Sequence, residues 1–266
     1  MSGGTEARIA ERWHDVAGRR VRSLEAGGPG GGEAPVVVVV PGLGALGYLL
    51  DTLAGCAAWA RAYLLDVPGF GHRRPAAGEV ELPAMVRLVA AWLGAVPGRP
   101  VVLAGHSTGA QVALHVAASL PGRVEALTLL GPVFPPEQRT VAGVLPPFLR
   151  TLRHEPLGAV PATLPYYVRG GVRAMARFIR SGQQDAPEAV AGGVSCPVLV
   201  ARGAQDALAP AEWAERLAGA AARGRAVTVP GAHAFPFRRG GLTAALIADV
   251  AAEARSGRDR PGGPGG

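Results

Sequence analysis

The chain has 266 residues, of which 48% are hydrophobic, and it contains two cysteines, Cys56 and Cys196. These proportions predict a globular protein with a core and exclude a disordered chain, a collagen-like chain and a disulfide-stapled scaffold. The net charge of +7 comes from arginines scattered along the chain, with no basic stripe interleaved with aromatic residues. We therefore expect no binding of nucleic acid.

The longest apolar stretch without a charge runs from Ala34 to Leu50 and is interrupted by Pro41 and three glycines. A membrane-spanning helix needs about 20 apolar residues, so we expect no membrane span. The N-terminal residues are charged and lack the apolar core of a signal peptide. Two cysteines so far apart suit a reducing compartment. We therefore expect a cytoplasmic protein.

The first predicted elements are a short hairpin, formed by Trp13–Ala17 and Arg20–Leu24 around Gly18. The glycine- and proline-rich segment 27–32 predicts a mobile loop. Five consecutive valines, Val36–Val40, predict a central parallel strand that is buried on both faces. Helices and strands then alternate, with helices expected at 49–60, 82–93, 108–120, 209–218 and 242–255, and strands at 61–65, 101–104, 124–130, 197–201 and 226–229.

This alternation predicts an α/β fold with a mostly parallel central sheet covered by helices on both faces. The segment between Gly131 and Ser195 contains no convincing strand, only helical pieces such as 160–168 and 173–179. A long insertion at the carboxyl edge of a sheet predicts a helical lid after the sixth strand; helices that merely pad the sheet are the alternative. We therefore expect a core of residues 1–131 and 195–255, a cap of residues 132–194, and a disordered tail over 256–266.

The segment Gly105-His106-Ser107-Thr108-Gly109 lies between a predicted strand and a predicted helix. In such a tight reversal, side chains at the two glycine positions would collide with the neighbouring strand and helix. The opening N–H groups of the helix point toward the serine oxygen. The pattern predicts Ser107 as a nucleophile; a glycine-rich turn without chemistry is the alternative.

A serine hydroxyl needs a base, and the base needs an acid that orients it. His233 follows the predicted strand 226–229, in a loop at the carboxyl edge where Ser107 also emerges. Open α/β sheets build their sites at this edge, so we predict His233 as the base rather than a surface-loop histidine. The remaining histidines are less well placed: His106 beside Ser107 but pointing away from it, and His14, His72, His115 and His154 in a strand, a loop, a helix and the lid.

Asp206 follows the predicted strand 197–201 and so reaches the same edge of the sheet. We predict it as the acid that orients His233. An N-cap of the helix that begins near Ala209 is the alternative role, and the two roles can coexist. Glu137, after the strand 124–130, is the next candidate for the acid.

The order Ser107, Asp206, His233 along the chain is the order found in α/β-hydrolases and differs from the other folds that use these three residue types. Over residues 12–255 the sequence resembles the α/β-hydrolase superfamily, in particular single-domain enzymes with a helical cap. The motifs that carry the resemblance are the segments 36–44, 66–71, 105–109, 197–206 and 231–233.

The resemblance implies an oxyanion hole made of two backbone N–H groups. One is the N–H of Thr108, directly after the serine, and the other is the N–H of Leu43, in the glycine loop after the valine strand. The family often has His-Gly in this loop, where this chain has Pro41-Gly42. Because the donor is a backbone group, the hole is expected to form without that histidine.

The resemblance also implies a serine hydrolase that cleaves a carboxylic ester or related acyl bond through an acyl-enzyme. We expect no metal, because no cluster of His, Cys and carboxylate residues has the spacing of metal ligands, and no organic cofactor. The expected partner is a small, apolar acyl substrate, and the sequence predicts no oligomeric state. Candidates for contact with that substrate, with core packing of the lid as the alternative, are Phe70, Phe148, Tyr166, Tyr167 and Phe178.

Two other classes of function remain open. One is an enzyme that uses the same three residues on another bond: a thioesterase, a carbon–carbon bond hydrolase, or a lyase or cyclase. The other is a ligand-binding or receptor-like member of the fold with little turnover, because a fold does not determine function.

Overall fold

The structure is a computed structural model that describes residues 8–27 and 34–258. Eight strands of this part form one sheet in the order β1-β2-β4-β3-β5-β6-β7-β8. The pairs β1–β2 and β2–β4 are antiparallel, and all other neighbours are parallel. The predicted mostly parallel sheet is confirmed, with strands at β1 (Ala10–Val16), β2 (Arg19–Ala26), β3 (Val36–Val40), β4 (Arg61–Leu65), β5 (Val101–His106), β6 (Val124–Leu130), β7 (Val198–Gly203) and β8 (Gly224–Val229).

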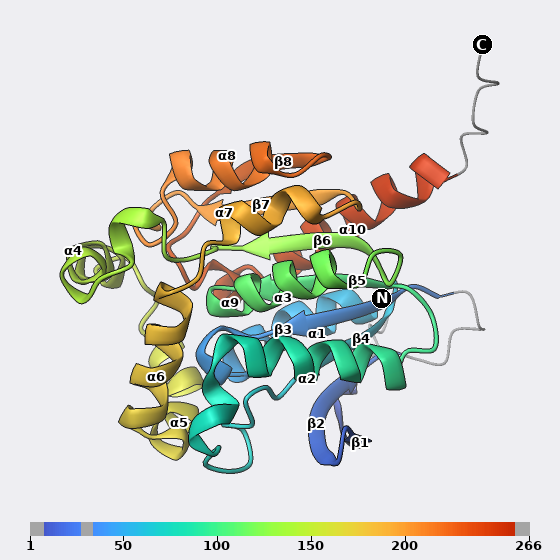
Figure 1. Cartoon of the computed structure of the whole chain (residues 1–266), viewed down its shortest axis with the longest axis horizontal. Coiled ribbons are helices and arrows are strands. Elements are labelled where there is room, and N and C mark those ends of the chain that lie inside the picture. The colour runs from blue at the N-terminus through green and yellow to red at the C-terminus, as the bar shows by residue number, and fades with distance from the viewer. Residues whose placement is uncertain (1–7, 28–33, 259–266) are drawn as a thin grey trace, which may run out of the picture.

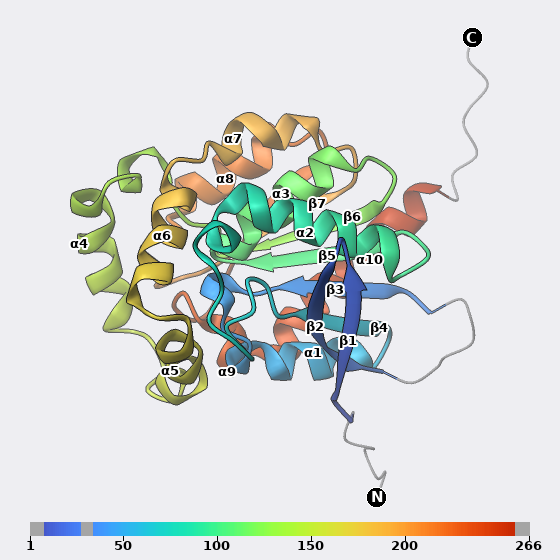
Figure 2. The same cartoon turned by 60° about the horizontal axis from the view of Figure 1, so that its bottom comes forward.

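Helices cover both faces of the sheet because successive side chains of a buried strand point to opposite sides (Figures 1 and 2). In β3, Val36, Val38 and Val40 join the core under α2, α3 and α8, whereas Val37 and Val39 join the core under α1 and α10. All five valines are buried, as the sequence predicted. These helices are α1 (Leu50–Ala57), α2 (Leu82–Ala95), α3 (Thr108–Ser119), α8 (Ala211–Ala220) and α10 (Gly240–Arg258).

The strand order reverses at β3, which pairs with β4 on one side and with β5 on the other. The loops that leave the carboxyl ends of β3 and β5 therefore diverge, and a crevice between such loops is the usual ligand position in an open α/β sheet. Val40 pairs with Gly105, which brings the Pro41–Gly42 segment beside Ser107. A Cβ added to Gly42 would lie 2.7 Å from the Cβ of Ser107, so only glycine fits there.

Between β6 and β7 the chain forms helices α4 to α7, and α4, α5 and α6 lie beyond the carboxyl end of β6, toward which its arrowhead points (Figure 1). The predicted pieces 160–168 and 173–179 correspond to parts of α5 and α6, whereas no bounds were predicted for α4. The reason is Pro146 and Pro147 in the middle of α4, since proline removes helical N–H donors and normally ends a helix. The bounds are α4 (Val141–Leu152), α5 (Ala159–Gly170), α6 (Val172–Gln183) and α7 (Pro187–Val190), and a short helix α9 (Phe235–Arg238) follows β8.

The predicted disordered tail is wrong at its start. Helix α10 continues to Arg258, and the Ser256 hydroxyl donates a hydrogen bond to the Ala252 carbonyl in its last turns. Residues 259–266, and residues 28–32 of the predicted mobile loop, lie outside the described residues. Within the described ranges, no helix has the length and apolar character needed to cross a membrane.

Candidate active site

Ser107 sits on a strained turn between β5 and α3. Its backbone has φ 57° and ψ −124°, a conformation that a residue with a side chain adopts only under structural constraint. The two flanking glycines make the turn possible: a Cβ on Gly105 would collide with the Gly109 carbonyl, and a Cβ on Gly109 would collide with the Val40 carbonyl. The strand–turn–helix setting predicted for this motif is therefore present.

Three side chains from three strand ends form one chain of hydrogen bonds. The Oγ of Ser107 lies 2.9 Å from Nε2 of His233, and Nδ1 of His233 lies 2.8 Å from Oδ2 of Asp206. Because an ionised carboxylate only accepts, Nδ1 carries the proton and Nε2 is left to accept from the Ser107 hydroxyl. The other Asp206 oxygen, Oδ1, accepts from the N–H groups of Leu208 at 2.9 Å and Ala209 at 3.1 Å. These two bonds close a turn ahead of α8 (Ala211–Ala220), whose N-cap is Pro210, so Asp206 does not cap that helix.

The alternatives considered from the sequence lie elsewhere. Glu137 is exposed in a 3-10 turn after β6, and His154 is exposed between α4 and α5. Three other histidines are hydrogen-bonded to different partners: His14 to Ser23, His72 to Asp66 and His115 to Asp185.

The charges of His233 and Asp206 stabilise each other. Burial alone would lower the pKa of His233, but the charge of Asp206, the hydrogen bond between them and the charge of Glu155 together raise it above its ordinary value. Burial would likewise raise the pKa of Asp206, but the nearby imidazole and the hydrogen bonds that this carboxylate accepts lower it overall. The site therefore favours a carboxylate beside an imidazole that readily takes up a proton.

Leu43 and Thr108 meet beside the serine. Leu43 has a φ of 44°, and its N–H donates to Oγ1 of Thr108 at 2.9 Å. Thr108 is the first residue of α3, where the opening N–H groups of a helix have no intrahelical acceptor. The sequence placed both N–H groups at the site but did not reveal that the Leu43 N–H has a side-chain acceptor.

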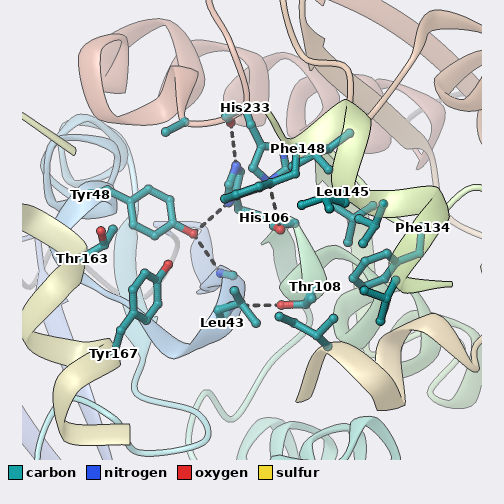
Figure 3. Close-up of a pocket in the computed structure, with 18 residues that line it drawn as sticks. Leu43, Tyr48, His106, Thr108, Phe134, Leu145, Phe148, Thr163, Tyr167 and His233 are labelled. Carbon is teal, nitrogen blue, oxygen red and sulfur yellow. Dashed lines mark hydrogen bonds between the residues drawn. The ribbon is translucent and has the colours of Figure 1, made fainter. Parts of the chain in front are cut away.

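A second hydrogen-bond chain ends at the backbone of His233, and no sequence motif indicates it. Oη of Tyr48 accepts from the Gly42 N–H at 2.8 Å and lies 2.8 Å from Nδ1 of His106 (Figure 3). Nε2 of His106 lies 2.9 Å from the His233 carbonyl, which can only accept, so Nε2 carries the proton. Burial, followed by the charge of His233, lowers the pKa of His106 to about 3. Neutral His106 thus accepts from Tyr48 and links the loop after β3 to the loop after β8.

Glu155 connects the segment between α4 and α5 to the same loop. Its two carboxylate oxygens lie 3.0 and 3.2 Å from the backbone nitrogen of Ala234, next to His233. Burial raises the pKa of Glu155 above its ordinary value, partly offset by the hydrogen bond from Ala234. This carboxylate was absent from the sequence-based site because its partner is 79 residues away.

A cavity of about 360 Å³ opens above Ser107 and His233. Tyr48 and Tyr167 lie on one side of it, and Phe134, Leu145 and Phe148 lie on the other (Figure 3). Apart from the serine, threonine, tyrosine and histidine groups at its base and one wall, the lining is apolar, and it includes Val133, Val144, Ile179 and Leu208.

Two of the five predicted substrate contacts, Phe148 and Tyr167, line this cavity, and the other three do not. Phe70 and Phe178 are buried in the core on the α2–α3 side of the sheet. Glycines at positions 44 and 170 make room for the Phe70 ring, since a Cβ at either would come within 2.8 Å of it. Tyr166 packs against the core because neighbouring residues on a helix point about 100° apart.

The described residues contain no group of three or more His, Cys, Asp or Glu side chains placed to hold a metal ion.

The comparison with known families agrees with the fold. The model of the alpha/beta hydrolase family matches residues 37–246, so the chain belongs to that family and is a hydrolase by class. The sequence resemblance to α/β-hydrolases is thereby confirmed.

Curated relatives match only parts of the chain. The acetyltransferase component of the acetoin cleaving system of Pseudomonas putida is 37% identical over 116 residues, which are 44% of this chain and 31% of that protein. The pimeloyl-[acyl-carrier protein] methyl ester esterase of Methylococcus capsulatus is 38% identical over 103 residues, 37% of each chain. The lipase LipV of Mycobacterium tuberculosis is 45% identical over 67 residues, 25% of each. The matches thus span between 25% and 37% of the length of these relatives.

Solved structures match almost the whole chain. The enol-lactonase from Burkholderia xenovorans has a TM-score of 0.72 at 18% identity, covering 91% of this chain and 100% of that one. A bacterial membrane phospholipase A has a TM-score of 0.74 at 19% identity, covering 93% and 87%. At such low identity these similarities show the fold alone.

Proposed function

We propose that this protein is a serine hydrolase that cleaves a carboxylic ester with an apolar acyl or alkyl group. The observation that carries the proposal is the hydrogen-bond chain from Ser107 through His233 to Asp206, on a strained turn that opens into an apolar cavity. A strained serine with an oriented imidazole is the arrangement that activates a hydroxyl for attack on an acyl carbon.

In the proposed reaction, Nε2 of His233 takes the proton of Ser107 as its Oγ attacks the carbonyl carbon. Asp206 holds the imidazole in the required tautomer and stabilises the imidazolium that forms. His233 then protonates the leaving alcohol, which leaves an acyl-enzyme on Ser107. A water molecule, deprotonated by His233, attacks this ester and releases the acid.

The oxyanion of each tetrahedral intermediate would be held by the N–H groups of Leu43 and Thr108. In the structure the Leu43 N–H donates to the Thr108 hydroxyl. The oxyanion would replace this hydroxyl as the acceptor, and the hydroxyl, whose own hydrogen is not used in that bond, would donate to the same oxygen. Such donors stabilise the charge that develops in the transition state by several kcal/mol each.

We further propose that residues 132–194 form a cap over a core of residues 1–131 and 195–255. Val144, Leu145 and Phe148 of α4 and Tyr167 of α5 supply walls of the cavity, so this segment would shape the part of the site that contacts the substrate. The relatives named as a lipase and a methyl ester esterase support an ester rather than another acyl bond.

Labelling with a fluorophosphonate, read by intact mass, tests the proposal. The wild type should gain one adduct, and Ser107→Ala should gain none. Ser119→Ala, a serine at the end of α3, is the matched control and should label like the wild type. Absence of an adduct on folded wild-type protein would contradict the proposal and favour a ligand-binding role.

The bond class is tested by a panel of acyl esters and acyl-CoA thioesters of matched chain length. Hydrolysis of the esters with a kcat/KM at least as high as that of the thioesters is the expected result. A strong preference for thioesters would make the protein a thioesterase that uses the same three residues.

A further inference from the structure

The exposed large hydrophobic side chains of this protein are concentrated in one region. Within the described residues, all of them except Trp13 and Leu242 lie between positions 141 and 172, where they are 46% to 88% exposed. This region is the stretch from α4 to the start of α6, at one end of the molecule (Figures 1 and 2). Exposed apolar side chains that are concentrated in this way mark an interaction site more often than singly scattered ones do.

On α4 the exposed apolar residues are Val141, Leu145, Phe148, Leu149 and Leu152. Their spacing places them on a single face of the helix. The buried positions of this helix are Pro147 and Thr151, and the Thr151 hydroxyl accepts from the backbone N–H of Ala207. The helix thus packs through its less apolar side. Val141, Leu145 and Phe148 of its stripe border the cavity, whereas Leu149 and Leu152 are exposed outside it.

Helix α5 repeats the arrangement. Val160, Leu164 and Val168 are exposed at a spacing of four residues, whereas the buried residues of the helix are Ala159 and Gly170. The two stripes belong to helices that form walls of the same cavity, α4 through Val141, Leu145 and Phe148 and α5 through Thr163 and Tyr167 (Figure 3). The apolar surface therefore reaches the cavity that holds Ser107.

The charge of this region is strongly positive. From residue 141 to residue 183 the single acidic residue is Glu155, which is hydrogen-bonded to the Ala234 N–H. The basic residues of the same stretch are all exposed, and they are Arg150, Arg153, Arg169, Arg173, Arg177 and Arg180.

We propose that the stripes of α4 and α5 dock on the surface of an anionic lipid bilayer. Helices with an outward apolar face and neighbouring arginines bind in the interfacial region of bilayers, with the apolar face inserted by about 5–10 Å. Anionic lipid headgroups complement the charge of the arginines near the membrane surface. Neither helix spans the bilayer; the face lies on it.

Two other occupants fit the observations less well. A second copy that covered the face symmetrically would bring two positively charged caps together, and like charges that meet at an interface oppose association. An acidic protein would match the charge, but protein interfaces are enriched in Tyr and Trp, whereas this face consists of Val and Leu with one Phe. The docking proposal has one consequence that rests on the proposed function. An ester whose chain lies in the bilayer would enter the cavity along Leu145 and Phe148.

Vesicle flotation with the Ser107→Ala protein tests docking without any hydrolysis of the vesicles. The protein should float with vesicles of phosphatidylglycerol and phosphatidylcholine, and it should bind phosphatidylcholine alone at least tenfold more weakly. Leu149→Glu and Leu164→Glu, both exposed and outside the cavity lining, should each weaken binding tenfold or more. Leu242→Glu, an exposed leucine of α10, is the matched control and should bind like the parent.

Each variant, made also in the wild-type background, should keep its fluorophosphonate labelling in the absence of vesicles, which shows that it is folded. No flotation with anionic vesicles, or an equal loss in Leu242→Glu, would overturn the proposal. So would a protein that sediments as a dimer and is dissociated by Leu149→Glu, because a second copy would then cover the face. Flotation of a wild type that never labels would leave docking supported while contradicting the proposed hydrolase.

Discussion

At the residue scale, two carboxylates act on His233, and their charges determine how the proposed base titrates. Asp206 holds its Nδ1 at 2.8 Å, and Glu155 binds the backbone N–H of the next residue. Both charges raise the pKa of His233 against the opposing effect of burial. An imidazole that is protonated cannot take the proton of Ser107, so the pKa of His233 sets the lower pH limit of activity.

We expect kcat/KM for an ester to be lost as the pH falls through a pKa above 6.5, the ordinary value for histidine. Asp206→Asn should move this midpoint to lower pH and reduce kcat by roughly 10³- to 10⁴-fold, because the tautomer is no longer held. Glu155→Gln should move the midpoint in the same direction with a smaller loss of rate. Glu137→Gln, an exposed carboxylate, is the control, and a midpoint that stays fixed in Asp206→Asn would contradict the assignment of the acid.

A second prediction at this scale concerns the contribution of the Thr108 hydroxyl to the rate. Thr108→Val keeps the shape of the side chain but removes the acceptor of the Leu43 N–H and the proposed extra oxyanion donor. We expect kcat to fall about tenfold, as one hydrogen bond in the transition state is worth roughly 1 kcal/mol or more. Thr108→Ser should restore most of the rate with an unchanged KM. Full activity of Thr108→Val would show that the hydroxyl has no part in the reaction.

At the scale of elements, the site depends on loops that leave three different strands. The Tyr48 hydroxyl joins the loop after β3 to His106 at the end of β5, and His106 joins the carbonyl of His233 after β8. Tyr48 and His106 are buried, so a missing partner leaves an unsatisfied polar group in the interior.

Tyr48→Phe should therefore destabilise the fold by about 1–3 kcal/mol, measured by urea unfolding, because the Gly42 N–H and His106 Nδ1 lose their partner. We also expect a loss of kcat with little change in KM, since the loop that carries Leu43 is no longer held. Tyr63→Phe, at a buried tyrosine of β4, serves as the control for removing a tyrosine hydroxyl that is not part of this hydrogen-bond chain. A fall in stability without any change in kcat would mean that the link is structural alone.

At the scale of the whole molecule, the sheet and the helical segment between β6 and β7 supply different parts of the site. The sheet brings Ser107, Asp206 and His233 together, and helices α4 to α6 close the apolar side of the cavity. Substrate preference should therefore change with residues of the helical segment, while the reactive groups stay in place.

Phe148→Ala should enlarge the cavity on the side away from Tyr48 and Tyr167. We expect kcat/KM to shift toward esters with longer or bulkier chains, by roughly tenfold for a change equivalent to one or two methylene groups. Phe178→Ala, which removes a buried core ring outside the cavity, is the comparison and should lower stability by about 3–5 kcal/mol. An unaltered chain-length profile in Phe148→Ala would remove Phe148 from the substrate-binding residues.

Much of the fold could be predicted from the sequence because its causes are local. The run of valines, the alternating helices and strands, and the glycines around Ser107 each depend on near neighbours in the chain. The positions of His233 and Asp206 follow from one further rule, that parallel strands end at one edge of the sheet. The bounds of α4 were not predicted because two prolines interrupt the helical pattern. The helix forms nevertheless, and it packs against the β7–α8 loop.

The family, the chain order of Ser107, Asp206 and His233, and the tight turn around Ser107 follow from the sequence alone. Which side chains line the cavity depends on contacts between distant segments. Tyr48 and His106 are 58 residues apart, and Glu155 and Ala234 are 79 apart, so no local pattern records either contact. Phe148 lines the cavity, whereas Phe178 is buried in the core. Both are phenylalanines of equal hydrophobicity, so only the packing of each helix decides which way its side chain faces.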